Sequence, residues 1–274
     1  DVYKRQLHNP VNDQLSRIWQ YMYEGVNRAN YMIENKDKID FPRKNEMYGE
    51  VHFLRAFFYF ELVKIYGDVP LFTHGRLTAG DSGTLTRVPK SEVYAVIESD
   101  LNSAISALPA QKSTDGRATS FTAHALLGKV YLYQGKYSEA ANILEPLIGL
   151  YTLPSNPGSV FLVSGENGPE SVFEIQHSKE SNGWNWGWLP QSTEGNFGVI
   201  HHGIRGYNGP TYSSGWSFNV PTDEFHKAFK SGDKRRDASI LDIVKWAEDN
   251  NASYNEGYEH TGYFNNKYLS LIHI

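Results

Sequence analysis

The chain contains no cysteine among its 274 residues. This absence excludes a disulfide framework, a thiol nucleophile and a zinc site built from thiolates. The chain also has no excess of basic charge, since its 26 Lys and Arg residues and 31 Asp and Glu residues give a net charge of −5. A positive stripe for nucleic acid, or a polybasic patch for anionic lipid, is therefore not expected.

Long apolar runs are missing as well. The sequence has no uncharged run of about 18 residues that is apolar enough to span a bilayer. Its first residues lack the charged-then-apolar pattern of a signal peptide. We expect the chain as given to be soluble. Its terminal peptides, residues 1–6 and 270–274, resemble translated sequencing adapter, which indicates an internal fragment of a longer protein.

Signature motifs of common enzyme classes are absent too, because the sequence holds no G-x-S-x-G, H-E-x-x-H or G-x-x-x-x-G-K pattern. No metal site is expected at the adjacent His201 and His202, which would point to opposite sides of an extended segment and have no further ligands spaced around them. A glycoside hydrolase needs two carboxylates on opposite sides of a sugar. The second half supplies enough acids, but the sequence alone cannot place any two of them at a working distance: Glu166, Glu170, Glu174, Asp223 and Glu224.

The first half of the chain shows helical periodicity. From Leu15 to Ile33, apolar residues recur at spacings of three and four, which predicts one face of an amphipathic helix. Residues 46–66 are apolar on nearly all sides, as in a helix that is buried on more than one side. A third helix is expected to begin at Ser91, a good N-cap, and to end before Pro109.

Two further helices are expected over residues 120–135 and 138–150, the second kinked at Pro146. The short connection between them makes them antiparallel. Other helical pairs, including the first two helices, are expected to stack beside them, because one pair is not stable alone. The residues follow much of the tetratricopeptide pattern, in which small side chains let two helices approach: Leu127, Gly128, Tyr131, Gly135, Tyr137, Ala140 and Leu144.

The composition changes near residue 151, where Gly, Pro, Ser and Asn become frequent. Short strand-like runs such as residues 171–176 remain, and a last helix is expected over 222–229. The sequence therefore predicts a mainly α fold. It consists of a helical scaffold over residues 1–150 and a loop-rich, Gly- and Trp-rich variable region with a few short strands over 151–274.

One segment, RAFFYFELVKIYGDVPLF from Arg55 to Phe72, is typical of a buried helix with a stop signal at Gly67 and Pro70. Together with the residues before it, from Glu50, it resembles the hallmark segment of the SusD/RagB family, the glycan-binding outer-membrane lipoproteins of Bacteroidetes. The resemblance extends over most of the chain, in the order of the family, through residues 18–30, 93–119, 221–236 and 262–268.

The resemblance implies tetratricopeptide-like helical pairs, with residues 151–274 packed on them as part of a single SusD-like domain. It implies a non-catalytic protein of polysaccharide utilization and nutrient uptake, which needs no cofactor, binds a glycan and hands it to a SusC-like TonB-dependent transporter. Family members begin with a lipoprotein signal and a lipidated cysteine, which this sequence lacks. Attachment to the outer membrane is therefore expected of a full-length protein only.

A glycan site needs aromatic rings for the C–H faces of sugars and planar polar groups for the hydroxyls. Residues 181–190 (SNGWNWGWLP) have this composition, and in an extended strand their alternate tryptophans would share one face. These rings could equally pack over the helical layer, and Trp216 is expected to be structural. The candidate glycan contacts are Trp184, Asn185, Trp186, Trp188, Tyr207, Asn208 and Tyr212.

Two other interpretations stay open. The chain could be a helical-repeat glycoside hydrolase, or an intracellular tetratricopeptide scaffold for protein interaction, which should show several successive repeats of ~34 residues.

Asp233, Arg235 and Arg236 could bind an acidic sugar or form structural pairs beside a helix end. Arg55 and Glu61 are expected to make buried or half-buried polar contacts rather than a site.

Overall fold

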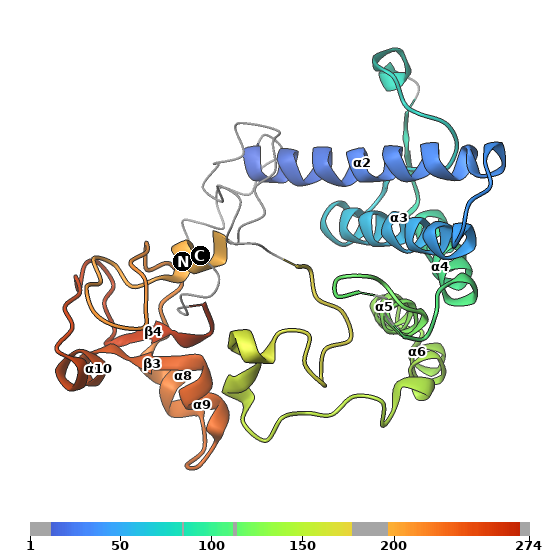
Figure 1. The fold of residues 1–274 in the computed structure, drawn as a ribbon. Helices are drawn as coiled ribbons and strands as arrows, with labels where there is room; N and C mark the ends of the chain where they lie inside the picture. Colours follow the sequence, from blue (N-terminus) through green and yellow to red (C-terminus); the bar gives the residue numbers. More distant parts are fainter. Residues whose placement is uncertain (1–11, 84, 112–113, 177–196, 269–274) are drawn as a thin grey trace. The chain divides into compact units, whose positions relative to one another are not determined.

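The computed structural model describes residues 12–83, 85–111, 114–176 and 197–268. The chain divides into two compact units, Asp1–Leu150 and Tyr151–Ile274, which are blue to green and yellow to red in Figure 1. Each unit is described by itself. The packing of both into a single SusD-like domain stays a prediction.

The first unit is a row of α-helices in which each helix contacts the next along the chain (Figure 1). A short antiparallel pair of strands, β1 (Val69–Pro70) and β2 (Arg87–Val88), joins the segments after α3 and before α4, with the 3-10 turn η2 (Ala79–Gly83) between them. This arrangement confirms the mainly α prediction. The helices are α2 (Asp13–Glu34), α3 (Lys44–Tyr66), α4 (Lys90–Ala107), α5 (Ser120–Tyr133) and α6 (Tyr137–Leu144).

The core of this unit comes mostly from α3, the helix that is apolar on nearly all sides. Tyr59, Phe60 and Leu62 of α3 are all almost completely buried, because α2 and α4 both pack against this helix. Each large apolar side chain that is fully buried contributes about 1.5–3 kcal/mol to folding. The neighbouring helices add Val26, Ile97, Leu101 and Leu127 to the same core.

Two glycines let paired helices approach closely. A Cβ on Gly128 of α5 would lie 2.5 Å from Cγ of Leu144 in α6, and a Cβ on Gly25 of α2 would overlap the Phe58 ring of α3. Gly135, with φ of +75°, makes the tight turn between α5 and α6. The predicted role of small residues in the tetratricopeptide-like pair is confirmed, and the α2–α3 pair uses the same device.

Two predicted helix ends were wrong. Helix α4 begins at Lys90 rather than after Ser91, and the Lys90 N–H donates to Oδ1 of Asp68 at 2.8 Å. The cap therefore comes from a residue distant in sequence, which local pattern does not indicate. Helix α6 ends at Leu144 and continues as the 3-10 turn η3 (Glu145–Leu147), because Pro146 lacks the N–H that another α-helical turn would need.

The second unit consists of short elements around a small core. Strands β3 (Ile240–Asp242) and β4 (Tyr263–Asn265) pair antiparallel, with Leu241 opposite Phe264. The core cluster consists of Ile204, Tyr207, Leu241, Ile243 and Phe264. The remaining elements are η4 (Pro157–Phe161), η5 (Val163–Gly165), α7 (Phe197–His202), α8 (Asp223–Ala228), α9 (Lys234–Ser239), α10 (Ile243–Asn250) and η6 (Asn266–Tyr268).

The helix predicted over 222–229 is confirmed as α8, with Oγ1 of Thr222 accepting from the Phe225 N–H at 3.2 Å. The strand predicted over 171–176 was wrong, since these residues form no strand and Ile175 is 63% exposed. Both carboxylate oxygens of Glu174 instead accept from the Asn167 N–H, at 3.0 and 3.1 Å. An alternating pattern without a neighbouring strand is not enough to form a sheet.

Candidate functional site

Three rings gather at α7 and the loop that follows it, and we call them the aromatic cluster: His201, Trp216 and Phe218. The His201 ring centroid lies 5.2 Å from that of Trp216 and 5.9 Å from that of Phe218, and the two aromatic rings are 5.8 Å apart. Phe218 is 47% exposed, and the other two side chains are half-buried. The aromatic cluster therefore presents ring surface to solvent.

Backbone hydrogen bonds hold this loop against the C-terminal end of α7. The Trp216 N–H donates to the Ile200 carbonyl at 2.8 Å, and the Phe218 N–H donates to the His201 carbonyl at 2.7 Å. Ser217 between them has φ of 57°, a left-handed conformation that is uncommon for a residue other than glycine. The rings are thus fixed in position by the main chain on both sides.

The aromatic cluster is uncharged near neutral pH. Burial, and then the neighbouring His202, lower the pKa of His201 below its usual value, so this ring loses its proton more easily than a free histidine. A cation also lies beside the cluster, because Nη2 of Arg205 donates to the Trp216 carbonyl at 3.3 Å. Apolar rings beside a directed donor match the composition that a sugar surface needs.

The loop candidates Tyr207 and Tyr212 lie in the core of the second unit. Tyr207 is 8% exposed; its hydroxyl donates to the Pro210 carbonyl at 2.7 Å and accepts from Nε1 of Trp246 at 3.0 Å. The Tyr212 ring packs on Trp246 with centroids 4.9 Å apart. Asn208 is exposed and pairs through its backbone with Ser253.

The structure brings Tyr207 and Tyr212 together, since their rings are 6.0 Å apart. A glycan contact from these two residues or from Asn208 stays a prediction. The four candidates of the tryptophan run, Trp184, Asn185, Trp186 and Trp188, lie outside the described residues.

None of the three rings of the aromatic cluster was predicted as a glycan contact. The sequence analysis treated Trp216 as structural and did not consider Phe218 or the His201 ring as a binding surface. The available signal was the spacing, because a single residue separates Trp216 from Phe218, just as a single residue separates successive tryptophans of the run.

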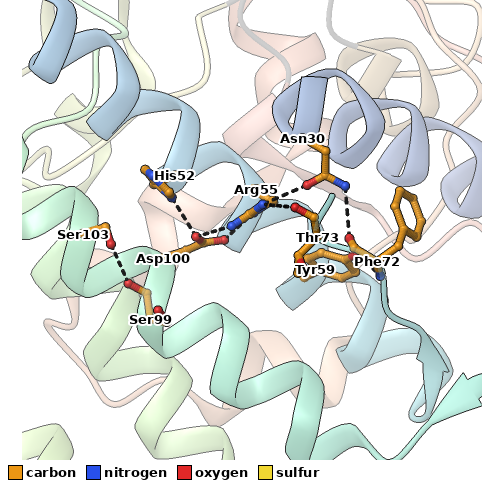
Figure 2. A network of polar contacts seen from close by, with 9 residues as sticks. All are labelled: Asn30, His52, Arg55, Tyr59, Phe72, Thr73, Ser99, Asp100 and Ser103. Carbon is orange, nitrogen blue, oxygen red and sulfur yellow. Dashed lines mark hydrogen bonds and ion pairs between the residues drawn. The ribbon is translucent and has the colours of Figure 1, made fainter. Parts of the chain in front are cut away.

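In the first unit, the polar group that stands out is a buried ion pair between Arg55 of α3 and Asp100 of α4 (Figure 2). Nε and Nη2 of Arg55 donate to the two Asp100 oxygens, both at 2.7 Å, and Nη1 donates to Oδ1 of Asn30 at 2.8 Å. Nδ1 of His52 lies 2.7 Å from the same carboxylate. The predicted buried contacts of Arg55 are confirmed.

The same network fastens the segment that follows α3. Nη1 of Arg55 donates to the Thr73 carbonyl at 3.2 Å, and Nδ2 of Asn30 donates to the Phe72 carbonyl at 3.0 Å (Figure 2). The Tyr59 hydroxyl also donates to the Phe72 carbonyl, at 2.6 Å. Because these groups are buried and bonded to one another, the network builds the scaffold rather than a ligand site.

Two of the predicted acids are already engaged. Glu174 accepts from the Asn167 N–H, and Asp223 forms an ion pair with Lys227. In the described ranges, no group of three or more His, Asp and Glu residues could hold a metal ion. In the same part of the chain, every helix is too short or too polar to cross a bilayer.

A family model described as "Starch-binding associating with outer membrane" matches residues 2–132. Among curated proteins, SusD-like protein P2 of Formosa agariphila is 28% identical over 239 residues, 84% of this chain and 46% of that protein. A solved structure, "Laminarin binding SusD-like protein", has a TM-score of 0.81 at 37% identity over 92% of this chain and 58% of that chain. The chain belongs to the SusD-like family.

A second solved structure supports the SusD-like fold in both units. It is surface glycan-binding protein A from Bacteroides thetaiotaomicron in complex with laminarihexaose, with a TM-score of 0.78 and 25% identity over 92% of this chain and 56% of that chain. The SusD-like chain spans about half the length of the curated relatives it matches, at 46% and 42% of the first two. These relatives are named for binding or for the family, not for a reaction.

Proposed function

We propose that this SusD-like chain binds oligosaccharide without catalysing a reaction on it, as part of a protein at the outer-membrane surface that passes the glycan to a SusC-like TonB-dependent transporter. The observation that carries the binding step is the similarity, over 92% of the chain, to a laminarin-binding protein and to a protein solved with laminarihexaose. The family description, which names the outer membrane, supports the location. Attachment through a lipidated N-terminus is part of the proposal for the full-length protein.

The aromatic cluster supplies a binding platform of a suitable kind. Apolar sugar surface removed from water on such rings contributes roughly 25 cal/mol per Å². The tryptophan run can add to the same surface, since Trp188 lies nine positions before Phe197, the first residue of α7. An extended chain of that length reaches at most about 30 Å.

The contacts of two of the five candidate acids bear on the proposed absence of turnover. A retaining or inverting glycosidase needs one free carboxylic acid and one free carboxylate facing each other across the sugar. Glu174 and Asp223 are held by Asn167 and Lys227. The alternative of a tetratricopeptide scaffold is less favoured, because the row of paired helices ends at Leu144 and irregular structure follows.

The test is calorimetric titration of laminarihexaose into the wild-type chain and into Trp184→Ala, Trp186→Ala, Trp188→Ala and Trp216→Ala. Loss of a ring that stacks on the sugar should weaken binding by about 1.5–3 kcal/mol, which is roughly ten- to hundredfold in Kd. Tyr258→Ala is the matched control, since Tyr258 is an aromatic residue of the same unit that is 84% exposed. Its Kd should stay within twofold of the wild type.

Unchanged affinity in all four tryptophan variants would move the site away from both the run and the aromatic cluster. Product analysis after long incubation of the chain with laminarihexaose tests the absence of catalysis, and shorter oligosaccharides appearing at an appreciable rate would contradict it. Transfer is tested by co-purification, in which the full-length protein should bring down a TonB-dependent transporter from outer membranes.

A further inference from the structure

The second unit contains an open pocket of about 820 Å³ between η4, the connection from α8 to α9, and η6. We call it the α8–α9 pocket. None of the described residues that line it belongs to the aromatic cluster. Its volume is within the range of about 300–1,000 Å³ that is typical of small-molecule sites.

The wall of the α8–α9 pocket is aromatic. Phe225 and Phe229 pack edge to face with centroids 5.3 Å apart, and Phe225 is 51% exposed. Phe161 of η4 lines the same pocket, and Nζ of Lys267 lies 4.9 Å from its ring centroid. Ring faces of this kind accept the C–H surface of a sugar and hold a cation beside it.

The arginine that lines the pocket is already neutralised. Nε of Arg235 donates to Oδ1 of Asp233 at 2.9 Å, and this arginine lowers the pKa of Asp233 to about 2. Arg236 bonds to Asp237 at 2.8 Å. The sequence analysis considered this basic group as a contact for an acidic sugar, but its charges are used at the start of α9.

Two other cations remain available to a ligand. Lys230 and Lys267 line the α8–α9 pocket, and neither ammonium group has an ion pair with a described residue; the acid Glu170 on the same wall has none either. Asp233 and Arg235 neutralise each other, so the remaining charges of the lining are the two lysines and Glu170. The pocket therefore has a net positive charge. The whole chain, in contrast, has a net charge of −5.

We propose that the α8–α9 pocket is a second binding site, which takes a short saccharide bearing a carboxylate or sulfate group. The sugar rings pack on Phe225, Phe229 and Phe161. The acidic group lies between the ammonium groups of Lys230 and Lys267, where charge-assisted hydrogen bonds are stronger than neutral ones. Glu170 accepts from a sugar hydroxyl and thereby selects against a ligand with an acid on that side.

The experiment is calorimetric titration of the 274-residue chain with trigalacturonate as the carboxylate probe, a 6-sulfated galactose disaccharide as the sulfate probe, and laminarihexaose as the neutral sugar. Lys230→Gln and Lys267→Gln should each weaken binding of an acidic probe at least fivefold. Lys267→Arg, which keeps the charge, should restore most of the affinity. The matched control is Lys227→Gln, because Lys227 lies on α8 outside the pocket and pairs with Asp223; it should change Kd by less than twofold.

Raising the salt concentration from 50 to 500 mM should weaken the acidic probes at least tenfold and leave laminarihexaose nearly unchanged, since only the former depend on charge. Trp216→Ala should leave the acidic probes unaffected, which separates this site from the proposed neutral-glycan surface. No saturable binding of either acidic probe, or equal losses in the Lys267→Gln and Lys227→Gln variants, would overturn the proposal. Far-UV circular dichroism of each variant excludes loss of folding as the cause.

Discussion

At the scale of single residues, the Arg55–Asp100 pair connects three parts of the first unit. The arginine lies on α3, the aspartate on α4, and their shared network holds the main chain at Phe72 and Thr73. A buried ion pair gains little over apolar packing when both partners are replaced, but removing one partner leaves an uncompensated buried charge. The pair therefore makes each of its members hard to substitute alone.

Arg55→Leu should lower the free energy of unfolding by about 3–5 kcal/mol, because Asp100 would keep its charge in a buried site without its bidentate partner. Urea denaturation followed by circular dichroism measures the change. Arg28→Leu is the matched control, since Arg28 pairs with Glu24 at the surface of α2, where its side chain is 78% exposed, and such a pair contributes about 0.2–0.5 kcal/mol. A loss below about 1 kcal/mol in Arg55→Leu would show that the buried pair is not a main support of the fold.

The sequence indicated that Arg55 makes buried polar contacts, because an arginine in a helix that is apolar on nearly all sides must be satisfied within the protein. It did not indicate the partners. Asn30 and Asp100 lie 25 and 45 residues away from Arg55 in sequence, and only the packing of α2, α3 and α4 brings them together. The sequence was limited in the same way at the candidate site. His201 and Trp216 are apart in sequence, and only the fold of the loop between them brings their rings into contact.

At the scale of elements, long helices with a regular apolar period could be predicted, whereas several of the short ones could not. Helices α2, α3 and α5 were expected close to where they occur, since their burial depends on many residues at once. Helices α9 and α10 have six and eight residues, too few for a period to emerge. Their start signals were present in Asp233 and Asp242, whose carboxylates accept the N–H groups of Arg235 and Lys245.

The start of α4 gives a prediction that separates a local cap from a distant one. Asp68→Ala should lower the free energy of unfolding by about 0.5–2 kcal/mol, because the Lys90 N–H loses its acceptor. Ser91→Ala should change it by less than about 0.5 kcal/mol, since Ser91 lies inside the helix and is exposed. Chemical denaturation of the two variants in parallel gives the comparison, and a larger loss in Ser91→Ala would restore the sequence-based assignment of the cap.

At the scale of the whole molecule, the two compact units differ in how they are stabilised. The first has a continuous core along α2 to α5, with large buried side chains such as Tyr59, Leu62 and Leu127. The second has a small core cluster joined by short elements and loops. The sequence indicated this difference, because loop-forming residues become frequent near residue 151. Such residues cannot supply a helical core.

The first unit should therefore fold by itself. A chain of residues 1–150 is expected to give an α-helical circular dichroism spectrum and a single cooperative thermal transition, since its buried residues contact one another within Asp1–Leu150. The same chain should not bind laminarihexaose measurably, because the aromatic cluster and the tryptophan run lie in 151–274. Gradual, non-cooperative unfolding of the fragment would show that the second unit completes its core. Binding with the affinity of the 274-residue chain would place the glycan site on the helices instead, whatever the aromatic loops contribute to the fold.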